Sequence, residues 1–235
     1  MTTPVQLIVF DLMGTLIVDD GLVEGAYSDA LSQAGHPPGT DTHVDLLHRI
    51  GEGRGRPTLV VLSDVLGDPV AAEEASWAFD DSILAHLDAL EPVPEAHAIL
   101  DELRNRSILA AVTTSFSGEV RKAVLDRLGW SGTFAAELSA HGSRRGHPAP
   151  DLLLEAILEL SIDSVAQVAI VGDTAADLEA GNRAGAGLVI GVLSGTHDRQ
   201  RLEQAPHTHL IDSVADLPGV LDRPHTSGHR RASDS

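Results

Sequence analysis

The sequence has no cysteine, a single lysine and few aromatic residues. The absence of cysteine excludes disulfides, thiolate metal ligands and a cysteine nucleophile, and it suits the reducing cytoplasm. Aromatic residues make up 3% of the 235 residues, so the chain offers few rings on which nucleic-acid bases could stack. No apolar run approaches the roughly 18 residues of a membrane-spanning helix. These absences favour a protein that binds neither nucleic acid nor membrane.

Positive charge is also scarce in this chain. The 16 Lys and Arg residues stand against 35 Asp and Glu residues, which gives a formal net charge of −19. A surface with this excess repels nucleic acid and anionic lipid. The N-terminal stretch MTTPVQLIVFD carries no basic region of the kind that opens a secretion signal. We therefore expect a cytoplasmic protein that acts on a small molecule, as a monomer or a homodimer.

Short apolar runs bounded by polar residues or glycine predict strands that are buried on both faces. These runs lie at residues 5–10, 108–112, 134–138, 168–171 and 188–193, and apolar residues with helical spacing lie at 94–104, 118–128 and 148–160. Strands that alternate with helices form βαβ units. The sequence therefore predicts an α/β fold, a doubly wound, Rossmann-like parallel sheet with helices on both faces.

The segment 19–91 interrupts this alternation with several helix-like stretches that glycine and proline separate. We predict that residues 19–91 form an inserted all-helical domain, and that residues 1–18 and 92–222 together form the core domain. The final stretch, 223–235, is polar and nearly devoid of aliphatic residues, so we expect it to be disordered.

Polar residues follow two of the predicted strands at the point where each strand ends. Asp11 ends the first strand and is followed by Gly14 and Thr15, whose turn can present N–H groups to an anion. Thr114 and Ser115 end the second strand, just ahead of a helix N-terminus. Ordinary capping of a turn or a helix would also explain each feature alone. Because ligands of doubly wound sheets bind at the carboxyl ends of the strands, we expect these residues to lie together.

A third strand ends in two further carboxylates. Asp173 closes the apolar run in AIVGDTAADLEAGNRAG, and Asp177 follows four residues later, one turn into the next helix. The two could be unrelated residues of a helix start. Carboxylates that converge with Asp11 repel one another unless a cation is present, and oxygen ligands of this kind suit Mg²⁺.

Four segments in this order, VFDLMGTL, AAVTTSFS, GHPAPDLLLEA and VAIVGDTAADLEAGNRAGA, resemble the signature segments of the haloacid dehalogenase superfamily. The predicted helical domain follows the first segment, as the cap of these enzymes does. The resemblance implies a hydrolase in which Asp11 attacks phosphorus and forms an aspartyl-phosphate that water hydrolyses.

The resemblance also implies a role for each residue of the predicted site. Asp11, the main-chain carbonyl of Met13 and Asp173 would hold Mg²⁺, and Asp177 would order the outer shell. Thr114 would bind the transferring phosphoryl oxygens, with Gly14, Thr15 and Ser115 beside it in contact with the substrate.

Met13 is the first departure from the superfamily pattern. Phosphatases and mutases usually have a second aspartate there, whose proton transfer contributes about 10²–10⁴ in rate. The phosphonatase-like branch, related to phosphonoacetaldehyde hydrolase, also lacks this aspartate, and the stretch DGLVEGAYSDAL resembles that branch. The Schiff-base lysine of that branch aligns with Arg54, which cannot form an imine. We expect Arg54 to bind an anionic or hydroxylated substrate instead.

His147 is the second departure, because it stands where the superfamily has a lysine, or an arginine in phosphonatase relatives, that bridges nucleophile and phosphate. It could act as a protonated replacement or as a neutral hydrogen-bond donor. Alternatively, Arg144 or Arg145 supplies the fixed charge to the substrate, or the position has lost its role in a poor catalyst.

The sequence thus leaves several functions open. The favoured one is a Mg²⁺-dependent hydrolase of the phosphonatase-like branch that acts on a small phosphorylated or phosphonate substrate. A phosphate-binding regulatory protein with little or no turnover is an alternative, since Met13 and His147 both depart from the pattern. A metal-independent haloacid dehalogenase is another, although Asp173 and Asp177 argue against it. A nucleotide-binding domain is disfavoured because no glycine-rich phosphate motif follows the first strand.

Overall fold

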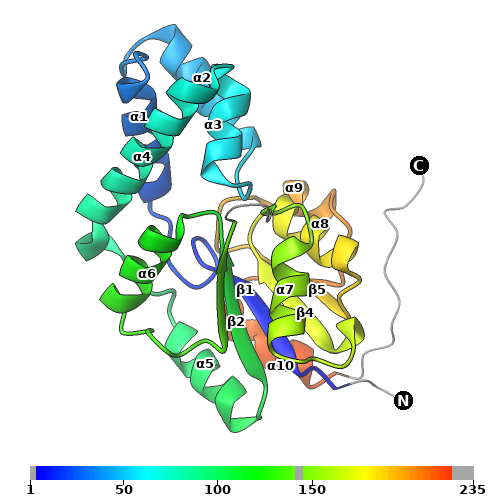
Figure 1. Ribbon diagram of the computed structural model, residues 1–235. Coiled ribbons are helices and arrows are strands. Elements are labelled where there is room, and N and C mark those ends of the chain that lie inside the picture. The colour runs from blue at the N-terminus through cyan, green and yellow to red at the C-terminus, as the bar shows by residue number, and fades with distance from the viewer. Residues whose placement is uncertain (1–3, 141–144, 224–235) are drawn as a thin grey trace.

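The computed structural model describes residues 4–140 and 145–223, whose core is one six-stranded parallel sheet (Figure 1). The strand order is β3-β2-β1-β4-β5-β6, so the chain winds outward from β1 in both directions. This architecture confirms the predicted α/β fold class. The strands are β1 (Leu7–Asp11), β2 (Leu109–Thr114), β3 (Ala136–Ser139), β4 (Val168–Gly172), β5 (Leu188–Val192) and β6 (His209–Ile211).

Helices cover both faces of the sheet, because the side chains of each buried strand alternate between two apolar clusters. One face packs against α5 (Ala96–Asn105), α6 (Gly118–Arg127) and α10 (Leu217–Leu221). The other packs against α7 (Asp151–Glu159), α8 (Ala175–Ala184) and α9 (Arg199–Glu203). Short 3₁₀ turns lie at η1 (Leu87–Ala89), η2 (Val165–Gln167) and η3 (Val214–Asp216).

Four of the helices between β1 and β2 in the chain form a separate layer beside the sheet, which we call the cap (Figure 1). They are α1 (Leu22–Gln33), α2 (Asp41–Glu52), α3 (Thr58–Leu66) and α4 (Pro69–Ala85). Phe79 of α4 packs on Tyr27 of α1 with ring centroids 4.6 Å apart, and on Phe116 of the core at 6.0 Å. The cap therefore has its own apolar centre, which continues into the core.

The chain enters and leaves the cap through two segments that pair with each other. The Val18 N–H donates to the Glu91 carbonyl over 3.0 Å, and the Val93 N–H donates to the Leu16 carbonyl over 2.8 Å. These bonds hold the two connections side by side at the base of the cap, which places the cap over the carboxyl end of β1.

The structure adds elements that the apolar pattern does not predict. The edge strand β6 has three residues, all only partly buried, and α9 has five. Segments this short carry too few apolar positions to show a period. No helix of the described residues is long and apolar enough to cross a membrane.

Candidate functional site

The nucleophile predicted at Asp11 lies at the end of β1, followed by a tight turn. The Gly14 N–H donates to the Ile17 carbonyl over 2.7 Å, and Gly14 has a φ of +84°. A side chain at position 14 would come within 2.2 Å of Asp173 Oδ2, so both the conformation and the close approach require glycine there. The turn thus brings the backbone that follows Asp11 against the carboxylate at the end of β4.

Asp177 both caps its helix and faces the site. Thr174 is the N-cap of α8, its hydroxyl accepts from the Asp177 N–H, and the Asp177 Oδ2 atom accepts from the Thr174 N–H over 2.9 Å and its Oγ1 over 2.7 Å. This capping box satisfies donors that the helix start would otherwise leave free. The local helix chemistry therefore fixes the direction of the carboxylate.

Asp11, Asp173 and Asp177 offer oxygen atoms that all lie within 4.8 Å of one another. Burial, then the charges of Asp177 and Asp173, raise the pKa of Asp11 well above its usual value. Burial and the charge of Asp177 raise the pKa of Asp173 to about 6. Three converging carboxyl groups, of which Asp11 and Asp173 have raised pKa values, fit a hard cation such as Mg²⁺, whose positive charge offsets the repulsion between them.

The raised pKa of Asp173 predicts how the metal-free protein responds to pH. A carboxyl group with a raised folded-state pKa stabilises the fold while it is protonated, and this contribution declines as the pH rises toward the folded pKa. We expect an effect on the order of 2 kcal/mol, present near pH 4 and lost above about pH 6. Thermal unfolding with a chelator, compared with the Asp173→Asn variant across this range, measures it; parallel curves would contradict it.

The loop after β5 holds Asp173 in place, and sequence reasoning missed it. The Thr196 N–H donates to Asp173 Oδ2 over 2.6 Å, and the Thr15 hydroxyl lies 3.4 Å from Asp173 Oδ1. Ser194 Oγ donates to the Gly14 carbonyl over 3.2 Å, which ties the loop to the turn after β1. The only sequence signal is the SGTHD stretch at a strand end, at the same edge of the sheet as Asp11 and Asp173.

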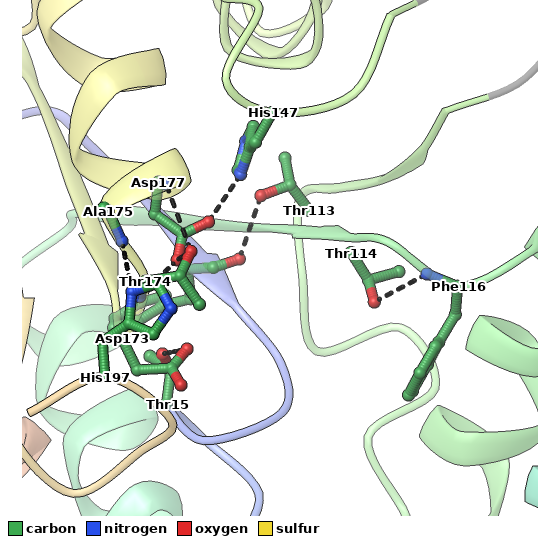
Figure 2. A network of polar contacts seen from close by, with 11 residues as sticks. Thr15, Thr113, Thr114, Phe116, His147, Asp173, Thr174, Ala175, Asp177 and His197 are labelled. Carbon is green, nitrogen blue, oxygen red and sulfur yellow. Dashed lines mark hydrogen bonds and ion pairs between the residues drawn. The ribbon is translucent and has the colours of Figure 1, made fainter. Parts of the chain in front are cut away.

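His147 contacts Asp177 rather than standing alone, as Figure 2 shows. Its Nδ1 lies 2.6 Å from Asp177 Oδ1, and its buried Nε2 has no hydrogen-bond partner among the described residues. If Nδ1 donates to the carboxylate, Nε2 of a neutral ring is an acceptor, and only a protonated ring donates from both nitrogens. Asp177 therefore orients the imidazole through Nδ1, and Nε2 keeps the capacity for one hydrogen bond.

Thr114 is the last residue of β2, and Ser115 follows it; β2 pairs with β1 in parallel register, with Thr113 opposite Asp11. The Thr114 hydroxyl accepts from the Phe116 N–H over 3.3 Å (Figure 2). Ser117, not Thr114 or Ser115, caps α6 by accepting from the Val120 N–H. Helix capping therefore does not explain Thr114 and Ser115.

The cap closes over these residues and leaves a cavity of about 20 Å³, room for about one water molecule. The core lines it with Asp11, Met13, Thr114, Ser115, Phe116, Asp173, Thr174 and Thr196, and the cap lines it with Val23, Tyr27, Arg54 and Gly55. A larger cavity of about 590 Å³ lies at the base of the cap, but none of the three carboxylates lines it. The small cavity is the candidate active site.

Arg54 reaches the cavity, but its guanidinium is already engaged. Its Nη2 donates to Asp19 Oδ2 over 2.6 Å and to Thr196 Oγ1 over 3.3 Å, and the Arg54 and Asp19 side chains are 14% and 9% exposed. In this arrangement the Arg54 guanidinium lies in a nearly buried ion pair, and its contact with a substrate stays a prediction.

Arg145 is not brought to the cavity. Its exposed side chain donates to both carboxylate oxygens of Asp151, over 3.2 and 2.8 Å, at the start of α7. In this arrangement Arg145 is paired with Asp151 and does not line the cavity, and its contact with the substrate stays a prediction. Arg144 and most of the predicted disordered tail, 224–235, lie outside the described residues.

Comparisons with known proteins identify the family of this chain. A sequence profile for the haloacid dehalogenase-like hydrolases matches residues 5–185. Phosphonoacetaldehyde hydrolase of Bordetella pertussis is 34% identical over 155 residues, 56% of each chain, so this chain spans about half the length of that relative. The enzyme of the same name from Vibrio cholerae is 26% identical, with 94% of this chain and 95% of the relative covered.

A solved structure gives the same fold. The phosphonoacetaldehyde hydrolase-like protein from Oleispira antarctica superposes with a TM-score of 0.80 at 22% identity, covering 94% of this chain and 92% of the other. The sequence profile spans well over half of the chain, from β1 to the end of α8. With Asp11, Asp173 and Asp177 gathered at one edge of the sheet beneath a helical cap, the chain belongs to the haloacid dehalogenase-like hydrolase family.

Proposed function

We propose that this protein is a Mg²⁺-dependent hydrolase that acts on a small phosphorylated or phosphonate substrate through an aspartyl-phosphate intermediate. The observation that carries the proposal is the convergence of Asp11, Asp173 and Asp177 within 4.8 Å of one another beneath the cap. The names of the Bordetella and Vibrio relatives support the substrate class.

Asp11 supplies the nucleophile. One of its oxygens attacks phosphorus, the bond from phosphorus to the leaving group breaks, and the new acyl phosphate is then hydrolysed by water to free phosphate and the original carboxylate. Asp11, the Met13 carbonyl and Asp173 would hold Mg²⁺, and Asp177 would orient its outer shell. When bound, the ion supplies positive charge that keeps the carboxylates ionised and polarises the phosphoryl group.

Residues at the end of β2 bind the phosphoryl group. Thr114 and Ser115 line the cavity beside Asp11, and each has a hydroxyl and an N–H group that could donate to a phosphoryl oxygen. Fixed donors there stabilise the charge that develops on the phosphoryl oxygens in the transition state. His147 contacts Asp177, and its Nε2, which has no hydrogen-bond partner among residues 4–140 and 145–223, can still donate or accept one hydrogen bond.

The leaving group receives neither a proton from the side chain at position 13 nor activation by a Schiff-base lysine. The thioether side chain of Met13 has no ionisable proton to donate. The only lysine of the sequence, Lys122, lies exposed on α6 with its ammonium paired to Asp126. The imine route of phosphonoacetaldehyde hydrolysis is therefore closed to this chain. We infer a substrate whose leaving group is good by itself or is protonated by the substrate or by solvent.

Replacing Met13 by aspartate tests this explanation of the substrate class. We expect the Met13→Asp variant to hydrolyse simple alkyl phosphates about 10²-fold faster, because the new carboxyl group can protonate a poor leaving group. Steady-state assays with an alkyl phosphate and with p-nitrophenyl phosphate measure the effect. The gain should be much smaller for p-nitrophenyl phosphate, whose leaving group needs little protonation; equal gains would contradict the explanation.

The proposed function itself is tested by phosphate release from acetyl phosphate and p-nitrophenyl phosphate with and without Mg²⁺. We expect turnover of both that depends on the ion. A protein that releases no phosphate from a broad panel of esters, yet is stabilised against heat by phosphate, would instead be a phosphate-binding regulatory protein.

A further inference from the structure

Residues 52–57, the last residue of α2 and the loop that joins it to α3, form a part of the cap that touches the loops around the carboxylates; we call this segment the cap loop. Arg54 donates to Thr196, and Gly55 and Pro57 pack closely against Thr174 and Gly146. An exposed ion pair of 3.1 Å also joins Glu52 to Arg201 of α9. The cap loop therefore meets the core at several points around one rim.

The first of these contacts leads directly to Asp173. Arg54 Nη2 donates to Thr196 Oγ1 over 3.3 Å, and the N–H of the same threonine donates to Asp173 Oδ2 over 2.6 Å. The Thr196 N–H and hydroxyl both act to lower the pKa of Asp173 against the effect of burial. Thr196 thus holds a cap side chain and a metal-binding carboxylate at once.

The second contact leads to Asp177 in the same way. Gly55 has a φ of +85°, and a Cβ there would lie 2.2 Å from Thr174 Oγ1. The same Oγ1 donates to Asp177 Oδ2 over 2.7 Å (Figure 2). The cap loop therefore rests on both threonines that orient the carboxylates of β4 and α8.

Arg54 is held in this position by the base of the cap. Its partner Asp19 lies in the segment that enters the cap, where Asp19 Oδ1 also accepts from the Val23 N–H over 3.3 Å. Because the ion pair is nearly buried, rotating Arg54 away would leave a charge without a partner. Lifting the cap loop off the core therefore separates Arg54 from Thr196.

We propose that Arg54 and Thr196 are positioning residues that couple closure of the cap to the binding of Mg²⁺ at Asp173. Closure orients Thr196, Thr196 orients Asp173, and the ion binds more tightly to the closed protein; by reciprocity, the bound ion favours closure. The inference rests on the proposed function, since it takes the three carboxylates as the metal site. It gives Arg54 a role other than substrate recognition.

The Arg54→Gln variant separates this role from simple electrostatics. Removal of a positive charge near Asp173 would, by charge alone, tighten the binding of a cation. Loss of positioning weakens it, and we expect about fivefold weaker Mg²⁺ binding by calorimetric titration of the full chain without substrate. The Thr196→Val variant should weaken binding as well, Thr196→Ser should restore it, and the double variant should be no weaker than Thr196→Val.

The Glu52→Gln variant is the matched control, because it removes an exposed contact of the same loop that leads to no carboxylate. It should bind Mg²⁺ within about twofold of the wild type. In hydrogen exchange, Mg²⁺ should slow exchange at residues 53–56 in the wild type and in Thr196→Ser but not in Thr196→Val. This second readout reports closure without any assay of activity.

The outcomes distinguish this inference from the proposed function. A wild-type protein that binds no Mg²⁺ would contradict both. A wild type that binds Mg²⁺, with Arg54→Gln binding equally or more tightly, would overturn the coupling alone. Equal weakening in Glu52→Gln would also overturn it, because the cause would then be general loosening of the cap.

Discussion

Replacing Asp11 by asparagine is expected to lower Mg²⁺-dependent phosphate release by about 10⁴-fold or more, the loss typical of a removed covalent nucleophile. The amide has nearly the shape of the carboxylate but cannot form the acyl phosphate. Turnover of p-nitrophenyl phosphate, followed with enough protein to detect the residual rate, measures the effect. An unchanged rate in Asp11→Asn would contradict the covalent mechanism.

The unfolding temperature of the Asp11→Asn variant is the control for correct folding. Burial and two neighbouring carboxylates make the ionised form of Asp11 unfavourable. A neutral side chain of the same size removes that repulsion, so the metal-free variant should unfold at the same temperature as the wild type or above it. Lost activity together with a lower unfolding temperature would point to damage to the fold instead of to the chemistry.

Chelation of divalent cations is expected to lower phosphate release by about 10³-fold, because a metal that neutralises developing charge contributes several kcal/mol to the transition state. Re-addition of Mg²⁺ should restore the rate, which shows that the protein survives the treatment. Halide release from 2-haloacids should be measured in the same experiment, with and without the chelator. Halide release that persists with the chelator would establish a metal-independent dehalogenase and overturn the role given to Asp173 and Asp177.

The parts of the fold that the sequence predicts are those in which several consecutive residues follow one apolar pattern. Strands β1, β4 and β5 are almost wholly buried, so each stands out in the sequence as a run of mainly apolar residues bounded by polar residues or glycine. Strand β6 pairs only with β5 at the edge of the sheet and begins with His209. Its place depends on the finished sheet, which no local pattern encodes.

The candidate site likewise has one part that follows from the predicted strands and another that depends on tertiary packing. Asp11, Asp173 and Thr114 end strands, and parallel pairing brings strand ends together, so their convergence follows from the predicted topology. The bond from Arg54 to Thr196 joins residues 142 positions apart, through the placement of the cap. The pairing of Arg145 with Asp151 and the approach of His147 to Asp177 likewise depend on how α7 and α8 sit, which composition and spacing do not specify.

The aromatic contact between Phe79 and Phe116 has a consequence for the rate of the enzyme. Phe116 directly follows Ser115, and Phe79 belongs to the cap, so opening the cap exposes part of an apolar contact to water. A cavity with room for about one water molecule admits no phosphate ester unless the cap moves away from the core. Each cycle of the proposed reaction therefore includes at least one passage through an opened state, and the turnover number cannot exceed the frequency of that opening.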